Sequence, residues 1–494
     1  MKQALRDPIL ILLLLIGAFL IFANLGNMYL WQDEAETAQV AKNTLAFGFP
    51  RGYDGKNVLQ VTGGLGDNFI WVYHSWFQFY LTAFSFLIFG LNTFAARFPF
   101  AVLGFLSIFL TYRLSWCLFE DKNISRIATL LLVFSVPFLL HLRQCRYFSL
   151  TVFAVLLTLL YYLGFVENKK FSTAKLAICF IFLFHSNHGA FIPVFIVLFL
   201  HYIVFTFKNK DLKRLLTLCT LISLFTLPWL FWLKSWHQGQ SALTFRHLRR
   251  HFEFYIRTTN KYVFPIAFFS IAAVIYMAIK RKWPSLPVHI NKARFWLIVL
   301  TIAASIGFLL FVEQRHFRYI VYLIPLLLII EAIILSRWWK INRYLTAAVI
   351  LVLLLTNVFN NPKIRFPLFE YLYEITHDYD GPNEGIVKFL RKNANPQDIV
   401  KVPYGSAPTI FYTNLYVDSR PFFENETYPE WIVFRKDWID GQGLKSRYFQ
   451  EIARRYEKIV INYPDIMWGN RPEPGYHKFK TVADAPKVVI YRRK

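Results

Sequence analysis

Long apolar runs recur along most of the chain and are separated by short polar segments. The first run extends from Ile9 to Leu25, and eleven more lie between residues 76 and 359. A helix rises ~1.5 Å per residue, so it needs roughly 20 apolar residues to cross the hydrocarbon core of a membrane. The pattern predicts a polytopic α-helical membrane protein in which not every run crosses. The run at 76–91 is the weakest, because it is short and is interrupted by Thr82 and Ser85.

The pattern changes after residue 361, where prolines, mixed charges and short alternating runs replace the long apolar ones. The alternation predicts strands near 398–402, 458–462 and 487–491, with helices over 384–393 and 447–456. We therefore predict two domains. Residues 1–361 form a transmembrane catalytic domain with a first external loop at 27–75, and residues 362–494 form a soluble extracytoplasmic α/β domain.

Basic residues between the apolar runs predict the sidedness. Lys2 and Arg6 indicate a cytosolic N-terminus, and basic segments at 168–170, 208–214, 280–282 and 337–340 also favour the cytosol. Alternation then places the first external loop and the tail outside. A cytosolic start and an external tail require an odd number of spans, so we expect about 11 transmembrane helices, within a range of 10–13.

Composition agrees with this prediction. The chain is 56% hydrophobic and 19% aromatic, above the usual range of about 45–50% apolar residues in soluble proteins. The net charge of +25 would suit nucleic acid, but the positive residues lie mainly in short loops between apolar runs. We therefore expect membrane lipids as partners and no nucleic acid. The four cysteines lie in or beside apolar runs without close metal-ligand spacing, which favours a core role: Cys117, Cys145, Cys179 and Cys219.

An acidic cluster directly follows the first apolar run. It contains Asp33, Glu34 and Glu36. Carboxylates beside a bilayer usually have a pairing or functional reason, such as general-base catalysis or metal binding. A solvated helix start is the alternative, because acids favour a helix N-terminus. A second unusual segment, 235–261, is basic on the predicted outer side. It fits either a helix on lipid headgroups or a cationic wall around an anionic lipid substrate.

Four stretches stand out in this order: Asp33-Glu34-Ala35-Glu36, Phe89 to Pro99, Arg143 to Leu150, and Arg315-His316-Phe317-Arg318-Tyr319 with Pro325. They resemble motifs of the GT-C fold glycosyltransferases, and in particular of the bacterial protein O-mannosyltransferase and lipid A aminoarabinose transferase branch. This resemblance implies a location in a bacterial inner membrane. Two departures stand out. The family's first-loop His-Pro-Pro pattern is His74-Ser75-Trp76 here, and the third stretch carries arginines where some relatives have an acid.

The resemblance implies inverting sugar transfer from a polyprenyl-phosphate donor to the hydroxyl of a glycan, lipid or protein acceptor. Asp33 is the expected general base, with Glu34 as a second catalytic residue. Arginines suit the donor phosphate, so we expect Arg318, Arg315, Arg143 and Arg146 to bind it. Further substrate contacts are expected from Glu36, His74, Tyr147, Tyr319, His247 and Arg250. No cofactor is certain; a divalent metal remains an alternative, with Glu34, His74 and His188 as candidate ligands.

Each of these residues also has a plainer interpretation, as a helix cap, an ion-pair partner or an arginine at a membrane interface. Two other functions remain open. A transporter or lipid flippase would place polar residues at mid-membrane and often has internal repeats. Ionisable residues here cluster at the predicted span ends, with Glu331 as an internal exception. A scaffold with a partner-binding tail would explain the tail but not the acidic cluster.

Overall fold

Helices form where the sequence has its apolar runs, and polar residues between the runs set several of their starts. Asp7, Asp121, Asn291 and Asn342 are N-cap residues, and each side chain accepts hydrogen bonds from backbone N–H groups of the following turn. Such caps satisfy donors that otherwise have no partner at a helix start. Hydrophobic periodicity thus determines the helices, and the connecting polar residues determine where they begin.

The computed structural model describes residues 6–59, 65–167, 171–206, 212–233, 244–280, 291–360, 363–402, 404–419, 428–435, 446–466 and 469–494. The chain divides into two compact units. Unit 1 comprises Met1–Ala23, Phe100–Arg143 and Tyr147–Leu372; unit 2 comprises Asn24–Pro99, Gln144–Arg146 and Tyr373–Lys494. The predicted basic segment 168–170 lies outside the described residues, as do 208–211, 281–282 and the start of the basic stretch at 234–243.

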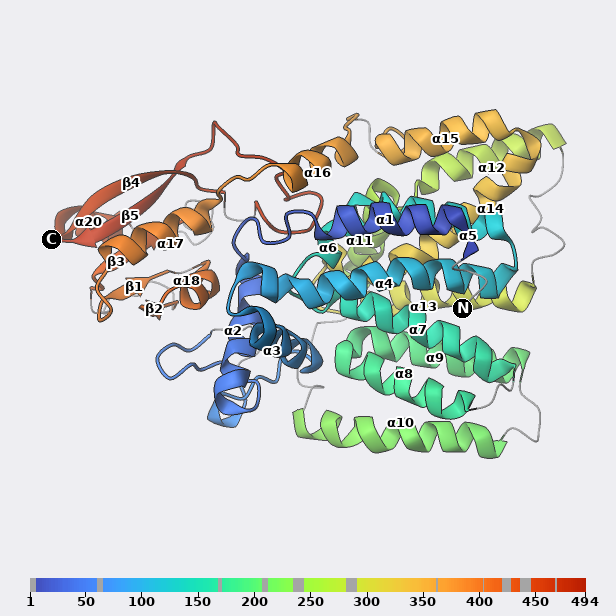
Figure 1. Ribbon diagram of the computed structural model, residues 1–494, viewed down its shortest axis with the longest axis horizontal. Coiled ribbons are helices and arrows are strands. Elements are labelled where there is room, and N and C mark those ends of the chain that lie inside the picture. The colour runs from blue at the N-terminus through green and yellow to red at the C-terminus, as the bar shows by residue number, and fades with distance from the viewer. Residues whose placement is uncertain are drawn as a thin grey trace. The chain divides into compact units, whose positions relative to one another are not determined.

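Unit 1 is helical. Its helices are α1 (Pro8–Phe22), most of α4 (Thr93–Phe119), α5 (Lys122–Val133), α6 (Val136–Leu142), α7 (Phe148–Val166), α8 (Ser172–Ser186), α9 (His188–Phe205), α10 (Leu212–Leu233), α11 (Phe245–Tyr262), α12 (Ile266–Lys280), α13 (Lys292–Leu309), η5 (Phe317–Leu323), α14 (Ile324–Ile341), α15 (Arg343–Leu355) and most of α16 (Pro367–Thr376). Helices α7, α8, α9 and α10 run alongside one another (Figure 1).

Among the described residues, six helices are long and apolar enough to cross a membrane. The number rises to eight if each of two bent helix pairs, α5 with α6 and α11 with α12, is counted as one span. Four shorter apolar helices are α1, α3 (Phe77–Phe89), α8 and α15. The polytopic helical fold is confirmed, and the count of eleven spans stays a prediction. Helix α3 has 13 residues, or ~20 Å at the usual rise, which fits the expectation that the run at 76–91 does not cross.

The C-terminal part of unit 2 contains a mixed five-stranded sheet in the order β2-β1-β3-β5-β4. Strand β1 pairs in parallel with β2 and β3, whereas β5 pairs antiparallel with β3 and β4. The strands are β1 (Ile399–Lys401), β2 (Tyr416–Asp418), β3 (Trp431–Phe434), β4 (Tyr456–Pro464) and β5 (Lys487–Arg493). The predicted strands at β1, β4 and β5 are confirmed; β2 and β3 were not predicted.

The remaining elements of unit 2 come from two distant parts of the sequence. From the loop at 27–75 come α2 (Gln32–Phe47) and η2 (Asp67–Phe69), and α3 follows directly after it; from the tail come α17 (Pro382–Asn393), α18 (Ser406–Tyr412) and α20 (Ser446–Arg455). Helices α17 and α20 match the predicted tail helices. Helix α18 packs on α2, and the rings of Phe86 and Phe411 stack with centroids 5.9 Å apart. The domain boundary at residue 361 stays a prediction, but loop and tail share one compact unit.

Candidate active site

The acidic cluster lies in the first turns of α2, within unit 2. Trp31 is extended, and the helix begins at Gln32 immediately after it. The preceding segment is fixed by the tail: the Leu30 N–H donates to the Tyr412 hydroxyl at 3.1 Å, and the Asn383 amide donates to the Leu30 carbonyl at 3.1 Å. The soluble tail therefore holds the backbone that leads directly into the acids.

Glu34 forms a buried ion pair with Arg97. The guanidinium donates to both carboxylate oxygens at 2.8 Å, and the exposed fractions of the two side chains are 6% for Arg97 and 0% for Glu34. The Cys145 N–H donates to the same carboxylate at 2.8 Å. Bidentate arginine–carboxylate pairs combine strength with fixed geometry. This one contact joins the first, second and third sequence motifs, which are far apart along the chain.

Arg97 also closes the turn that precedes the cluster. Its Nη1 donates to the backbone carbonyls of Leu25 at 3.2 Å and Asn27 at 2.7 Å. The guanidinium thus has partners on both of its sides, and its charge is balanced by Glu34. Within this arrangement Arg97 organises the backbone before α2 and fixes one face of the helix.

Asp33 and Glu36 face a different arginine. The Arg146 Nη2 lies 3.9 Å from the Asp33 carboxylate and 3.6 Å from the Glu36 carboxylate, and these acidic side chains keep exposed fractions of 17% and 14%. Nη1 of Arg146 donates to the Asp33 carbonyl at 2.8 Å and to the Thr37 hydroxyl at 3.0 Å. The hydrogen bonds to the Asp33 carbonyl and the Thr37 hydroxyl fix the guanidinium, whereas its Nη2 lies beyond hydrogen-bond distance of the two carboxylates.

His74 completes this group. Its Nε2 lies 3.2 Å from Arg146 Nη2, and its Nδ1 accepts from the Trp71 indole N–H at 3.3 Å. The imidazole also stacks on the Trp71 ring, with centroids 5.9 Å apart. Four of the predicted site residues therefore lie together in unit 2: Asp33, Glu36, His74 and Arg146.

The candidate metal ligands do not form a metal site in the described part of the chain, where no three His, Cys, Asp or Glu side chains gather. Both oxygens of Glu34 accept from Arg97, and His74 faces Arg146. His188 belongs to unit 1, where its ring lies 4.4 Å from that of Phe184. The carboxylate of Glu34 is thus already neutralised by a guanidinium and does not suit a metal.

The remaining candidate residues belong to unit 1. Arg143 is buried and donates to the Ala23 carbonyl at 2.6 Å and to the Tyr371 hydroxyl at 3.1 Å. Arg143 and Arg146 are thus only three positions apart but belong to different units. Because its partners lie at the end of α1 and on α16, the contacts of Arg143 fit a structural role.

The fourth motif lies at the start of η5. Arg315 is exposed, and its Nη1 donates to the Arg250 carbonyl at 3.4 Å. The guanidinium of Arg318 lies 5.8 Å from the centroid of the Tyr319 ring. Of the other predicted contacts, Tyr147 precedes α7 with its ring 5.0 Å from Phe148, and His247 on α11 stacks on His251. The substrate roles predicted for Arg315, Arg318, Tyr319, Tyr147 and His247 stay predictions.

Sequence reasoning did not name Arg97 as a site residue, although it lies inside the second motif. A signal was present, because an arginine next to an apolar run usually has a charged or backbone partner. Tyr412 was also missed. It is buried, stacks on Tyr29 with ring centroids 3.9 Å apart, and exchanges a hydrogen bond with Thr93 at 2.6 Å. No local pattern in the tail distinguishes this tyrosine from the others.

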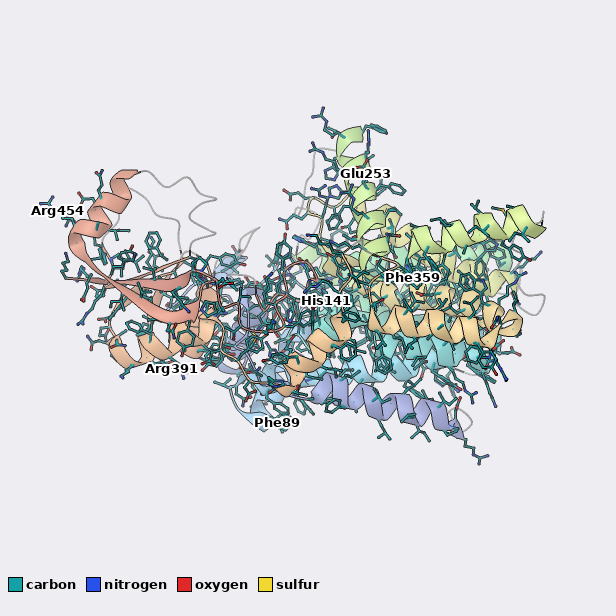
Figure 2. All side chains as sticks on the ribbon, turned by 90° about the horizontal axis from the view of Figure 1, so that it is seen from above. Phe89, His141, Glu253, Phe359, Arg391 and Arg454 are labelled. Atoms are coloured by element: carbon teal, nitrogen blue, oxygen red, sulfur yellow. The ribbon has the colours of Figure 1, made fainter. Side chains whose placement is uncertain are left out.

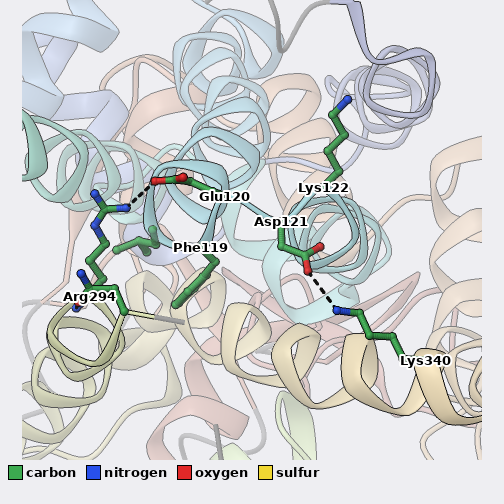
Figure 3. A pocket seen from close by; sticks show the side chains of 8 residues that line it. Phe119, Glu120, Asp121, Lys122, Arg294 and Lys340 are labelled. Atoms are coloured by element: carbon green, nitrogen blue, oxygen red, sulfur yellow. Dashed lines mark hydrogen bonds and ion pairs between the residues drawn. The ribbon is translucent and has the colours of Figure 1, made fainter. Parts of the chain in front are cut away.

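A separate polar cavity of about 600 Å³ lies in unit 1. Its lining residues are Leu118, Phe119, Glu120, Asp121, Lys122, Asn291, Arg294 and Lys340. Figure 3 shows two ion pairs within it, Arg294 with Glu120 at 3.1 Å and Lys340 with Asp121 at 3.9 Å. The acids and bases of this cavity pair with one another and join the ends of α4, α5, α13 and α14. The cavity therefore fits a structural role.

The fold is similar to that of solved membrane glycosyltransferases, and one stretch of the sequence matches a family model. The family model of dolichyl-phosphate-mannose-protein mannosyltransferases matches residues 73–232. A search of curated protein sequences gives no match. The crystal structure of ArnT from Cupriavidus metallidurans in the apo state is 13% identical, with a TM-score of 0.59 over 98% of this chain and 97% of that one.

Two further structures extend the match. ArnT from Cupriavidus metallidurans bound to undecaprenyl phosphate is 12% identical, with a TM-score of 0.57 over 98% and 97% of the two chains. The archaeal oligosaccharyltransferase AglB from Archaeoglobus fulgidus, in complex with an inhibitory peptide and a dolichol-phosphate, is 14% identical, with a TM-score of 0.53 over 84% of this chain and 64% of that one. The chain therefore has the fold of the GT-C glycosyltransferases, as its motifs predicted.

Proposed function

We propose that the protein transfers a sugar from a polyprenyl-phosphate donor to an acceptor hydroxyl, with Asp33 as the general base and inversion at the anomeric carbon. The observation that carries the proposal is the grouping of Asp33 with Glu36, His74 and Arg146 at the start of α2. The matched family model and the lipid phosphates named for ArnT and AglB support a polyprenyl-phosphate donor. The active side is proposed to be extracytoplasmic.

The chemistry requires a base near an acceptor and a cation near a leaving phosphate. An acceptor hydroxyl loses its proton as its oxygen attacks the anomeric carbon, and one carboxylate within hydrogen-bond reach can take that proton. Asp33 suits this role because its side chain is partly exposed and stands beside the cationic Arg146. The departing group is already a phosphate, so it needs positive charge rather than a strong acid.

Arg146 acts in this proposal by positioning Asp33 through its backbone contact at 2.8 Å and by balancing the charge of Asp33 and Glu36. Glu34 holds the helix in place through Arg97 rather than reacting. Arg315 and Arg318 remain our proposed ligands of the donor phosphate, because planar guanidinium groups bind phosphate oxygens in pairs. The acceptor is a glycan, a lipid or a protein.

The direct test is transfer by purified protein in lipid nanodiscs, with a panel of polyprenyl-phosphate sugars and candidate acceptors. We compare the wild type with Asp33→Asn and with the control Asp380→Asn, which makes the same chemical change at an exposed tail residue paired with Lys388. We expect Asp33→Asn to lose ~10²–10⁴-fold in transfer rate, the usual range for a general base. Unchanged transfer by folded Asp33→Asn would remove the base assignment. Vectorial lipid movement without turnover would favour a transporter.

A further inference from the structure

Helix α11 has three distinct faces. Successive residues of a helix are turned by ~100°, so positions four apart lie close together on one side. His251, Tyr255 and Thr259 follow this spacing and are almost completely buried, with exposed fractions of 4%, 0% and 2%. This face packs into unit 1, and the contact between Arg315 and the Arg250 carbonyl adds to the attachment. The other two faces remain exposed.

The second face is apolar. Phe245, Phe252 and Ile256 are spaced by seven and four residues, which places them within ~20° of one line along the helix. Their exposed fractions are 82%, 51% and 36%. Three large apolar side chains in one exposed line on a helix that also carries several arginines indicate contact with an apolar phase.

The third face is basic. Arg246, Arg250 and Arg257 are exposed and lie within ~40° of one another, about 120° around the helix from the apolar line. Between the two faces lies an exposed pair, with Arg249 donating to Glu253 at 2.7 Å. The basic line therefore runs beside the apolar line along the whole helix, an arrangement typical of helices that lie in a membrane interface.

The direction of α11 fits this location. It is bent by 82° relative to the apolar helix α12, which follows after a short break. Figure 2 shows α11, on which Glu253 is labelled, running nearly at right angles to that helix. If α12 crosses the membrane close to the bilayer normal, α11 lies close to the plane of the membrane.

We infer that α11 is an interfacial helix whose basic face binds the anionic headgroups of bilayer lipids. Phe245, Phe252 and Ile256 enter the acyl region, while Arg246, Arg250 and Arg257 remain at the level of the phosphates. Arginine side chains at this depth are attracted by anionic lipids and contribute to orientation. Of the two sequence-based interpretations of this basic stretch, the geometry supports the headgroup-bound helix. The inference is independent of sugar transfer.

The first test is lipid photo-crosslinking. A photoreactive phenylalanine analogue is placed at Phe252 of the full-length protein in nanodiscs that contain phosphatidylglycerol, and lipid adducts are measured by mass spectrometry. The matched control replaces Tyr416, an exposed aromatic residue on strand β2 of the soluble sheet. We expect at least tenfold more lipid adduct at Phe252 than at Tyr416. Equal or absent adduct at Phe252 would overturn the inference, because that side chain must then face water.

The second test addresses the basic face. The triple variant Arg246→Gln, Arg250→Gln and Arg257→Gln is expected to retain at least threefold less phosphatidylglycerol in native mass spectrometry than the wild type. A control variant with Lys392→Gln and Lys458→Gln removes two charges from the exposed tail and should retain the wild-type amount. Retention unchanged in the triple variant would contradict a headgroup site. Displacement of the bound lipid by one equivalent of polyprenyl phosphate would instead assign this face to the donor.

Discussion

Asp33 and Glu34 are adjacent in the chain, yet each is held by a different arginine in a different way. Glu34 is fully buried and shares two hydrogen bonds of 2.8 Å with Arg97. Asp33 is partly exposed and lies 3.9 Å from Arg146. A helix turns ~100° per residue, so neighbours on α2 necessarily face different surroundings. Glu34 faces the interior of unit 2, whereas Asp33 keeps part of its surface exposed.

The difference in burial and pairing gives the two adjacent acids different roles in our proposal, one structural and one chemical. A carboxylate whose oxygens both accept from a buried guanidinium cannot readily take a proton from a substrate, because the ion pair would be left unbalanced. A carboxylate that keeps part of its surface exposed can meet an acceptor hydroxyl. In our proposal the Asp-Glu pair of the motif therefore combines an acid that reacts with an acid that holds the helix in place, and the following predictions test that separation.

The largest expected effect comes from breaking the buried pair. Arg97→Ala leaves the Glu34 carboxylate buried without its cation, and removal of one partner from a buried pair costs about 3–5 kcal/mol. The measurement is the unfolding midpoint and the yield of folded protein. The exposed pair of Arg249 and Glu253 on α11 provides the control, since Arg249→Ala should leave the midpoint unchanged. Equal effects at the two pairs would contradict a structural role for Glu34.

Removal of the second arginine should affect activity more than folding. Arg146→Met deletes the cation beside Asp33 and Glu36 together with its contact to the Asp33 carbonyl. We expect transfer to fall roughly 10–100-fold with a smaller change in the unfolding midpoint, because Asp33 loses the group that positions it. Arg146→Lys, which keeps the charge but not the forked guanidinium, should recover part of the rate. A loss of rate that is fully explained by a loss of folded protein would assign Arg146 to packing alone.

A smaller effect is expected where the tail holds the segment before α2. Tyr412→Phe removes the acceptor of the Leu30 N–H and the partner of the Thr93 hydroxyl. The loss of one buried hydrogen bond costs about 1 kcal/mol, and more when a donor is left without a partner. Thermal unfolding measures the cost, with Tyr416→Phe on the exposed edge of the sheet as control. An unchanged midpoint would mean that water replaces the hydroxyl.

The smallest predicted effect is a pH dependence of stability. Burial raises the pKa of the Glu384 carboxyl, although hydrogen bonds from the Tyr29 and Gly381 N–H groups oppose the shift. The folded state then binds this proton more tightly than the unfolded state, so the contribution of Glu384 is largest at low pH and is lost as pH rises above its ordinary range. The difference in unfolding midpoint between the wild type and Glu384→Gln should therefore vary with pH between 4 and 7. A constant difference would contradict the raised pKa.

The sequence predicted the helical membrane fold, the soluble tail and most of the residues that gather at the candidate site. Local periodicity is sufficient for such elements, because apolar runs and alternating strands need only their own neighbours to be recognised. Strand β3 was missed because Trp431–Phe434 is a four-residue buried run without alternation. The parallel pairing of β1 with β2 and β3 depends on distant segments.

The pairing of charges could not be predicted in the same way. Glu34 meets Arg97 across 63 positions, and no spacing rule connects an acid in a loop with an arginine at the start of a long helix. Arg143 and Arg146 look equivalent in the sequence, yet Arg143 belongs to unit 1, whereas Arg146 lies beside Asp33 and Glu36 within unit 2. Which arginine a carboxylate meets is a property of tertiary packing, so sequence reasoning could name the group but not its partners.

The central claim is that Asp33 reacts while its neighbour holds the helix. The most direct test compares Asp33→Asn with Glu34→Gln in one preparation, measuring the single-turnover rate of sugar transfer per folded molecule alongside the unfolding midpoint. We predict that Asp33→Asn loses ~10²-fold or more in rate with an unchanged midpoint, whereas Glu34→Gln lowers the midpoint and leaves most of the rate per folded molecule. A wild-type rate in folded Asp33→Asn, or an Asp33→Asn defect that is entirely a loss of folding, would contradict the claim.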